Sequence, residues 1–127
     1  MPNYWLVKTE PSTYSFDDLK REGVATWDGV KNPVALKHLR AMQAGDEVFV
    51  YHTGNEKSVI GTATVVAPGD PPKLRAKGPL ARPVTLAEIK KDETFADSPL
   101  VRIGRLSVMP VALAQYQKLL KLGGASV

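Results

Sequence analysis

The sequence contains no cysteine, which excludes a disulfide framework, a thiolate metal site and a cysteine nucleophile in this 127-residue chain. It contains only two histidines, His38 and His52, which lie on different expected elements and lack the spacing of paired metal ligands. We therefore expect no metal site and no cofactor. A chain without thiols fits a reducing compartment. We expect a cytoplasmic protein, associated with the nucleoid in a bacterium or nuclear in a eukaryote.

Catalytic motifs and long apolar runs are missing as well. There is no Gly-x-Ser-x-Gly turn and no glycine-rich phosphate loop of standard spacing. The acid pairs at residues 17–18, 46–47 and 92–93 stand next to expected helix or strand ends, where carboxylates cap and solubilise. No stretch approaches the roughly 20 apolar residues of a membrane span, and no targeting segment is recognised. We expect no catalytic residues, no enzyme activity and no membrane partner.

The composition is that of one globular domain. With 43% hydrophobic and 24% charged residues, the sequence predicts a single domain over residues 1–127, which we expect to be a monomer. The formal net charge is only +4, so the distribution of charge says more than its sum. The segment between Asp70 and Glu88 has no acid and is rich in proline, which predicts a basic loop. The basic residues of this segment are Lys73, Arg75, Lys77 and Arg82. They either contact the phosphates of a nucleic acid or are simply solvated.

Local start and stop signals predict several short helices. A capping box at Ser15 begins a helix that ends near Glu22, and a second box begins a helix at Thr85. Asn32-Pro33 begins another helix, which we expect to end at Gly45. A last helix is predicted over residues 110–122, with residues 113, 116, 119 and 120 on its apolar side.

Strands alternate with these helices. They are predicted at residues 4–8, 47–53, 58–67 and 101–108, and Gly61 within the third indicates a bulge or a close backbone approach. The Gly54-Asn55 turn joins two strands too tightly for a parallel crossover. The predicted fold class is therefore α+β, with a mixed sheet curled into a small barrel and short helices in its connections.

The nine aromatic residues carry the most information about function. Trp27 precedes Asp28-Gly29 in a loop that leads to a helix N-terminus, an exposed place for a large ring. Either Trp27 covers the core from this loop, or it is a stacking platform for a planar base whose edge Asp28 and Asn32 read. His52, beside Tyr51 at the end of an apolar strand, is either a hydrogen-bonded structural residue or part of a pocket.

Four ordered segments resemble the motifs of the EVE domain family. They are residues 5–11 (Trp-Leu-Val-Lys-Thr-Glu-Pro), 27–32 (Trp-Asp-Gly-Val-Lys-Asn), 45–53 with Tyr-His-Thr at its end, and 105–111 (Arg-Leu-Ser-Val-Met-Pro-Val). They follow the family's order and span nearly the whole chain. The resemblance implies a PUA-like fold, which is a small bent β-barrel with mixed strands and flanking helices. It also implies binding of modified bases in nucleic acid.

The resemblance also assigns residues to a base-binding pocket. Trp27 corresponds to the pocket aromatic, with Asp28 and Asn32 as its polar neighbours. The remaining residues of the same motifs are expected around that cavity: Lys8, Tyr51, His52, Arg105 and Ser107.

This sequence departs from the family pattern at three places. Lys31 replaces a common arginine, which keeps the charge and loses the bidentate fork. Thr53 replaces a common serine. The segment at residues 70–80 is shorter than usual, so a shortened strand or an open barrel edge is expected there.

The expected function is recognition without catalysis. A flipped-out modified base, a modified cytosine or adenine in DNA, would stack on Trp27 and Tyr51 and be read by Asp28, Asn32 and Ser107. The cations of residues 73–82, with Lys8 or Arg105, would hold phosphates. Three alternatives stay open: an RNA-binding module of the same superfamily, a small hydrolase of modified nucleotides that uses His52 with Asp28 or Glu10, and a protein-interaction module with exposed aromatics.

Overall fold

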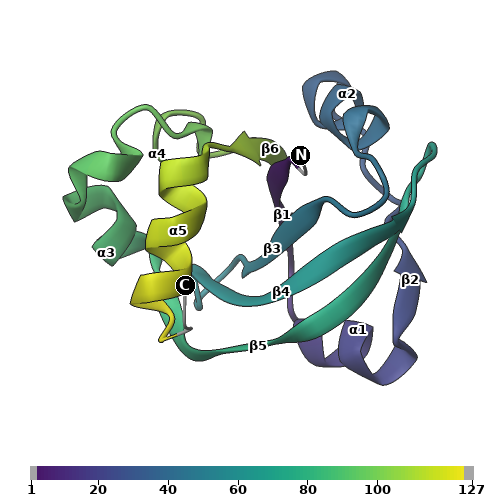
Figure 1. Cartoon of the computed structure of the whole chain (residues 1–127), viewed down its shortest axis with the longest axis horizontal. Helices are drawn as coiled ribbons and strands as arrows, with labels where there is room; N and C mark the ends of the chain where they lie inside the picture. The colour runs from purple at the N-terminus through teal and green to yellow at the C-terminus, as the bar shows by residue number, and fades with distance from the viewer. Residues whose placement is uncertain (1–2, 125–127) are drawn as a thin grey trace.

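The computed structural model describes residues 3–124, and its centre is a six-stranded mixed sheet that curls into a half-barrel (Figure 1). The strand order is β2-β5-β4-β3-β1-β6. Strand β1 pairs in parallel with β3 and antiparallel with β6, and the other neighbours are antiparallel. The α+β class and the mixed curled sheet are thus confirmed. The strands are β1 (Tyr4–Thr9), β2 (Val24–Thr26), β3 (Glu47–His52), β4 (Ser58–Ala67), β5 (Lys73–Thr85) and β6 (Val108–Val111).

Both predicted capping boxes are present. At α1 (Phe16–Glu22) the Ser15 hydroxyl accepts from the Asp18 amide at 3.1 Å, and the Asp18 carboxylate accepts from the Ser15 amide at 2.8 Å. At α3 (Leu86–Lys91) Thr85 and Glu88 make the same reciprocal pair. Each box satisfies backbone donors that a helix N-terminus leaves free, so these local signals were sufficient to define both helix starts.

Helix α2 (Pro33–Ala41) begins as predicted and ends earlier than predicted. The Asn32 side chain accepts from two amides of the first turn, and Pro33 stands at the first helical position. The helix ends with an extended residue at Met42. The expectation that Gly45 ends it is wrong, because Gly45 belongs to the next turn. There it has a φ of +93° and donates its amide to Val65.

The C-terminal third contains the largest error of prediction. The strand expected at 101–108 is wrong, because Ser98 caps a short helix, α4 (Pro99–Arg102). Strand β6 follows at residues 108–111, and α5 (Leu113–Leu122) begins after it rather than at residue 110. Pro110 is tolerated in β6 because this is an edge strand of the sheet. Leu113, expected on the apolar side of the helix, is exposed. A 3-10 turn (Glu93–Phe95) precedes α4.

The basic segment is a strand and not a loop. Residues 73–85 form β5, which β2 covers only at residues 73–75. Pro79 and Pro83 fit because the outer edge of β5 has no paired strand beyond that point among residues 3–124, and because its register with β4 shifts there. The side chains at residues 73 and 75 share one face by strand alternation, whereas Leu74 is buried on the other.

Gly61 allows α1 to pack closely on the sheet. A β-carbon at this position would lie 2.6 Å from the Phe16 ring, and the register with β5 shifts beside it. The predicted bulge is confirmed, and the group that approaches closely is the Phe16 ring rather than a backbone segment. The helix is thereby fixed against the strands beside the candidate site. No helix between residues 3 and 124 is long and apolar enough to cross a bilayer.

Candidate functional site

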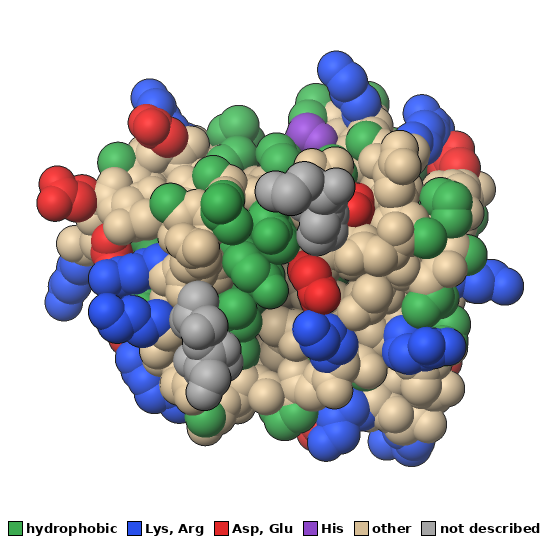
Figure 2. All heavy atoms as spheres, viewed as in Figure 1, with side chains coloured by type: hydrophobic (Ala, Val, Ile, Leu, Met, Phe, Trp, Pro, Cys, Tyr) green, Lys and Arg blue, Asp and Glu red, His purple; other side chains and the backbone are tan. Residues whose placement is uncertain are grey.

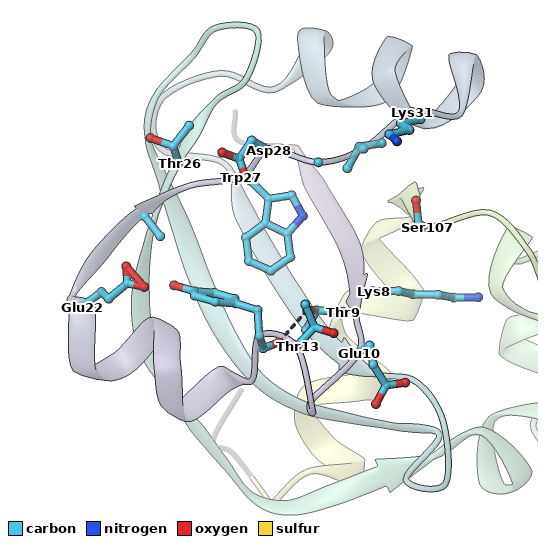
Figure 3. Close-up of a pocket in the computed structure, with 14 residues that line it drawn as sticks. Lys8, Thr9, Glu10, Thr13, Glu22, Thr26, Trp27, Asp28, Lys31 and Ser107 are labelled. Carbon is cyan, nitrogen blue, oxygen red and sulfur yellow. Dashed lines mark hydrogen bonds between the residues drawn. The ribbon is translucent and has the colours of Figure 1, made fainter.

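A cavity of about 720 Å³ lies where the end of β1, the connection from α1 to β2, and the loop at residues 27–31 come together (Figure 3). It has both polar and apolar walls. Four of the residues expected in a pocket line it: Lys8, Trp27, Asp28 and Ser107.

Trp27 lines the cavity and belongs to the core at the same time. Only 7% of the residue is exposed, and its ring meets the Tyr14 ring edge-on at 6.0 Å between centroids and 79° between planes. Its amide donates to the carbonyl of Pro72 at 2.9 Å, which ties the loop to the start of β5. Figure 3 shows the indole between Glu22 on one side and Ser107 on the other. The two interpretations of Trp27 are therefore compatible with each other.

The loop after Trp27 turns sharply and exposes two charges to the cavity. Gly29 has a φ of +80°, a conformation that favours glycine. Asp28 and Lys31 are exposed on either side of it and line the cavity. Asn32 does not line it: its side-chain oxygen accepts from Val34 at 2.9 Å and from Ala35 at 3.1 Å, so the amide group is used as the cap of α2.

Lys8 and Ser107 join the ends of β1 and β6 at the opposite wall. The Lys8 amide donates to the Ser107 carbonyl at 2.8 Å. The Lys8 ammonium donates to the Gly104 carbonyl at 2.7 Å and lies 5.5 Å from the centre of the Tyr51 ring. Partial burial lowers the pKa of Lys8. In Figure 3 the ammonium points away from Trp27, so Lys8 contributes its stem to the cavity.

Tyr51, His52 and Arg105 do not line the cavity. Tyr51 and His52 are buried, and Arg105 is exposed. His52 Nε2 accepts from the amide of Phe16 at 2.9 Å, and His52 Nδ1 lies 3.1 Å from the Glu56 carboxylate. Because Nε2 accepts, the proton of the neutral ring is on Nδ1 and is donated to Glu56. His52 is therefore a hydrogen-bonded structural residue at the start of α1.

Several cavity residues were not identified from the sequence. Tyr14, Glu22 and Thr26 line one wall, and Glu10 and Thr13 line another. Tyr14 is held by the Thr9 hydroxyl, which donates to its carbonyl at 2.6 Å. These residues carry no shared local pattern, because they come from a turn, a helix end and a strand of three residues. The cavity brings them together only after the sheet has formed.

Carboxylates give the cavity much of its polar character. Glu10, Glu22 and Asp28 all line it. Hydrogen bonds from the Ser12 amide and hydroxyl lower the pKa of Glu10, so this carboxyl is charged at neutral pH. Lys31 provides a cation at the rim. An aromatic ring among charged acceptors and donors suits a planar ligand with polar edges.

Two of the four cations on β5 are paired with acids. Lys77 lies 3.1 Å from Glu47, and Arg82 makes two bonds to Glu88 at 3.2 and 2.8 Å. Within the described part of the chain, Lys73 and Arg75 have no ion pair. Figure 2 shows Lys and Arg side chains gathered in the region where Figure 1 places β5 and α1.

Comparison with known proteins gives a consistent family match. The model of the EVE domain matches residues 3–122. Mouse thymocyte nuclear protein 1 is 37% identical over 78 residues, which cover 52% of this chain and 34% of that protein. The zebrafish (Danio rerio) protein of the same name is 26% identical over 168 aligned positions, covering 95% of this chain and 73% of that protein. The chain thus spans about a third of the length of the mammalian relatives it matches.

Solved structures share the fold. A protein from Agrobacterium tumefaciens is 33% identical with a TM-score of 0.93, covering 97% of this chain and 94% of that one. A Rhodopseudomonas palustris protein is 37% identical with a TM-score of 0.90, covering 96% and 93%. The human THYN1 protein, in complex with DNA containing 5-methylcytosine, is 24% identical with a TM-score of 0.87, covering 98% and 99%. The two bacterial chains and this one cover each other almost completely, so a long insertion at residues 70–80 is not common to these structures.

Proposed function

Because this chain belongs to the EVE domain family, we propose that it binds DNA by taking one modified cytosine or adenine base out of the duplex into the cavity beside Trp27. One observation carries the proposal: the tryptophan of the family-like Trp-Asp-Gly segment lines a cavity of about 720 Å³ with polar walls. The human relative whose structure contains 5-methylcytosine DNA has the same fold. That likeness supports modified DNA as the partner.

The energetics of extrusion require an aromatic contact. Taking a base out of a duplex costs a few kcal/mol, and stacking on an aromatic side chain returns about 1–3 kcal/mol. Trp27 is held by the hydrogen bond from its backbone amide and by contact with the Tyr14 ring. The indole therefore loses little conformational freedom when a base binds. A preorganised platform of this kind favours binding because less conformational freedom is lost.

Only some of the residues expected to contact the base line the cavity. Asp28 and Ser107 line the cavity and are proposed to meet the base or its sugar. Asn32 acts through the loop, because its side chain caps α2. Tyr51 and His52 support the neighbouring wall from buried positions.

Phosphates are proposed to meet cations that acids do not neutralise. Lys31 lines the cavity, Arg105 is exposed near Ser107, and Lys73 and Arg75 stand on the outer face of β5. Lys77 and Arg82 are engaged with Glu47 and Glu88, so phosphates would compete with these carboxylates.

The surroundings of His52 favour binding without catalysis. Its Nε2 already accepts a hydrogen bond from a helix amide, so this nitrogen is not available as a general base. A hydrolase that used His52 with Asp28 or Glu10 would have to break that bond first.

The test is a binding titration with duplexes that carry either one 5-methylcytosine or the unmodified base at a single site. Trp27→Leu keeps an apolar group in the core and removes the aromatic face. We expect it to weaken binding of the modified duplex about tenfold or more. Tyr116→Leu is the matched control, because Tyr116 is a partly buried aromatic of α5 outside the cavity.

Both variants are first checked by thermal unfolding, and binding is measured well below their transitions. Equal affinity of wild type and folded Trp27→Leu for the modified duplex would contradict the proposed function. A matched RNA strand in competition separates DNA from RNA binding.

A further inference from the structure

Tyr14 and Glu22 form a polar corner of the cavity that the proposed function does not yet use. Both residues line the cavity, and Tyr14 packs against the Trp27 ring. Glu22 is the last residue of α1, and in Figure 3 it lies on the other side of Trp27 from Ser107. A base beside Trp27 would therefore have this corner within reach of one edge.

The Tyr14 hydroxyl is buried without a partner. Its oxygen makes no hydrogen bond within residues 3–124. A buried polar group without a partner destabilises the fold unless a ligand or water completes its hydrogen bond. Burial raises the pKa of Tyr14 to about 12, and the Glu22 carboxylate contributes after it, both as the acceptor that the hydroxyl faces and as a negative charge. The hydroxyl therefore keeps its proton at neutral pH and has a hydrogen bond to donate.

The two side chains offer opposite functions next to each other. The Glu22 carboxylate only accepts hydrogen bonds, whereas the Tyr14 hydroxyl donates one. Resting on the proposed function, we infer that Glu22 accepts from the exocyclic amino group of the bound base while Tyr14 donates to the adjacent ring nitrogen. The pair is thus a specificity-determining element for amino bases.

The chemistry of the bases makes this arrangement selective. Cytosine and adenine carry an amino donor next to an unprotonated ring nitrogen, which accepts. Thymine, uracil and guanine carry a carbonyl acceptor next to a ring N–H, which donates. A carbonyl opposite Glu22 sets two acceptors against each other, and a ring N–H opposite the Tyr14 proton sets two donors against each other. A site of this kind rejects the mismatched base strongly, because its own polar groups are then unpaired.

The test compares 5-methylcytosine with thymine, which have the same ring and methyl group and differ in the edge that Glu22 and Tyr14 would read. Each base is placed opposite an abasic site in the same duplex, so neither loses a pairing partner on extrusion. We expect wild type to bind the 5-methylcytosine duplex at least tenfold more tightly than the thymine duplex.

Variants then assign the selectivity to residues. Glu22→Gln can turn an amide N–H toward a carbonyl, and we expect it to reduce the preference to within about threefold. Tyr14→Phe is expected to weaken binding of 5-methylcytosine and leave thymine unchanged. Asp17→Asn removes the same charge from the same helix outside the cavity, so it should keep the wild-type preference. Thermal unfolding verifies that each variant is folded.

The possible failures are distinguishable. If wild type binds the 5-methylcytosine duplex no better than the unmodified duplex, the proposed function fails and this inference fails with it. If wild type prefers the modified duplex but binds thymine equally well, the inference alone is overturned. The same holds if folded Glu22→Gln and Tyr14→Phe both keep the full preference.

Discussion

At the scale of single residues, Trp27 belongs both to the core and to a cavity wall, two placements that the sequence treats as alternatives. The residue is almost completely buried, yet its ring forms part of a cavity wall. Burial fixes the orientation of the ring, and the cavity leaves a part of it open to a ligand. A binding platform is more effective when its own conformation is already fixed.

His52 has a structural role at the start of α1. Its Nε2 accepts a hydrogen bond from the Phe16 amide, which has no acceptor within the helix because it lies in the first turn of α1. We predict that His52→Ala lowers the free energy of unfolding by about 1–3 kcal/mol, because it leaves this buried donor unpaired. Urea unfolding at pH 7 measures the change.

Glu56→Gln is the control for that prediction. It keeps the acceptor on His52 and changes only the exposed partner of Nδ1, so its effect should be clearly smaller. Wild-type stability of His52→Ala would show that the Phe16 amide is satisfied in another way.

At the scale of elements, the start of α3 couples a capping box to an ion pair. Hydrogen bonds from Arg82, and after them the Thr85 amide, lower the pKa of Glu88 to about 2. The folded state thus favours the charged carboxylate. This contribution to stability is present above the ordinary pKa of about 4.5 and is lost as the pH falls through about 2.

We predict that Glu88→Gln is less stable than wild type by up to about 1 kcal/mol at pH 7, since the pair is largely exposed. The glutamine keeps the capping box, so the difference reports the charge. Denaturant unfolding at several pH values should show the two proteins converging between pH 4.5 and 2. A difference that stays constant down to pH 2 would contradict this account.

The elements predicted from the sequence are those with local signals. Ser15, Thr85 and Asn32 each mark a helix start with a side chain that bonds nearby amides. The errors occur where pairing with a strand distant in sequence determines the secondary structure. The segment at residues 73–85 has a loop composition but becomes a strand because β4 pairs along it. Strand β6 begins where β1 provides a partner at residues 4–7.

The candidate site divides in the same way. Trp27, Asp28, Lys8 and Ser107 belong to segments that resemble a family, and they meet at one cavity. Tyr14 and Glu22 lie in no such segment, and only the packing of α1 against the sheet brings them to the same wall. Asn32 was expected in the pocket, but its side chain accepts hydrogen bonds from α2 amides. The Asn32-Pro33 helix-start signal also predicts this capping role.

At the scale of the whole molecule, the net charge of +4 is too small to account for the proposed DNA binding without a local concentration of cations. Lys73 and Arg75 project from the same face of β5, beside β2 and the loop that carries Trp27. This placement connects the outer surface of the sheet to the cavity.

We predict that the double variant Lys73→Gln, Arg75→Gln weakens binding to modified and unmodified duplexes by the same factor. It should reduce the slope of log K against log salt by about 2, which corresponds to two lost phosphate contacts. The control is Lys90→Gln, Lys91→Gln, which removes the same charge from α3. Equal slopes for the two double variants would exclude the β5 face as the phosphate contact.

The central claim is that a modified base enters the cavity beside Trp27, and the indole N–H signals of the protein report this directly. The chain has two tryptophans, and the Trp5 indole is bonded to the buried Asp46 carboxylate at 2.9 Å, outside the cavity. In a titration with a 5-methylcytosine duplex followed by ¹H–¹⁵N NMR, we predict a large shift of the Trp27 indole signal and little change at Trp5. An unmodified duplex should leave both signals near their starting positions. Saturable binding of the modified duplex without any shift at Trp27 would contradict the claim.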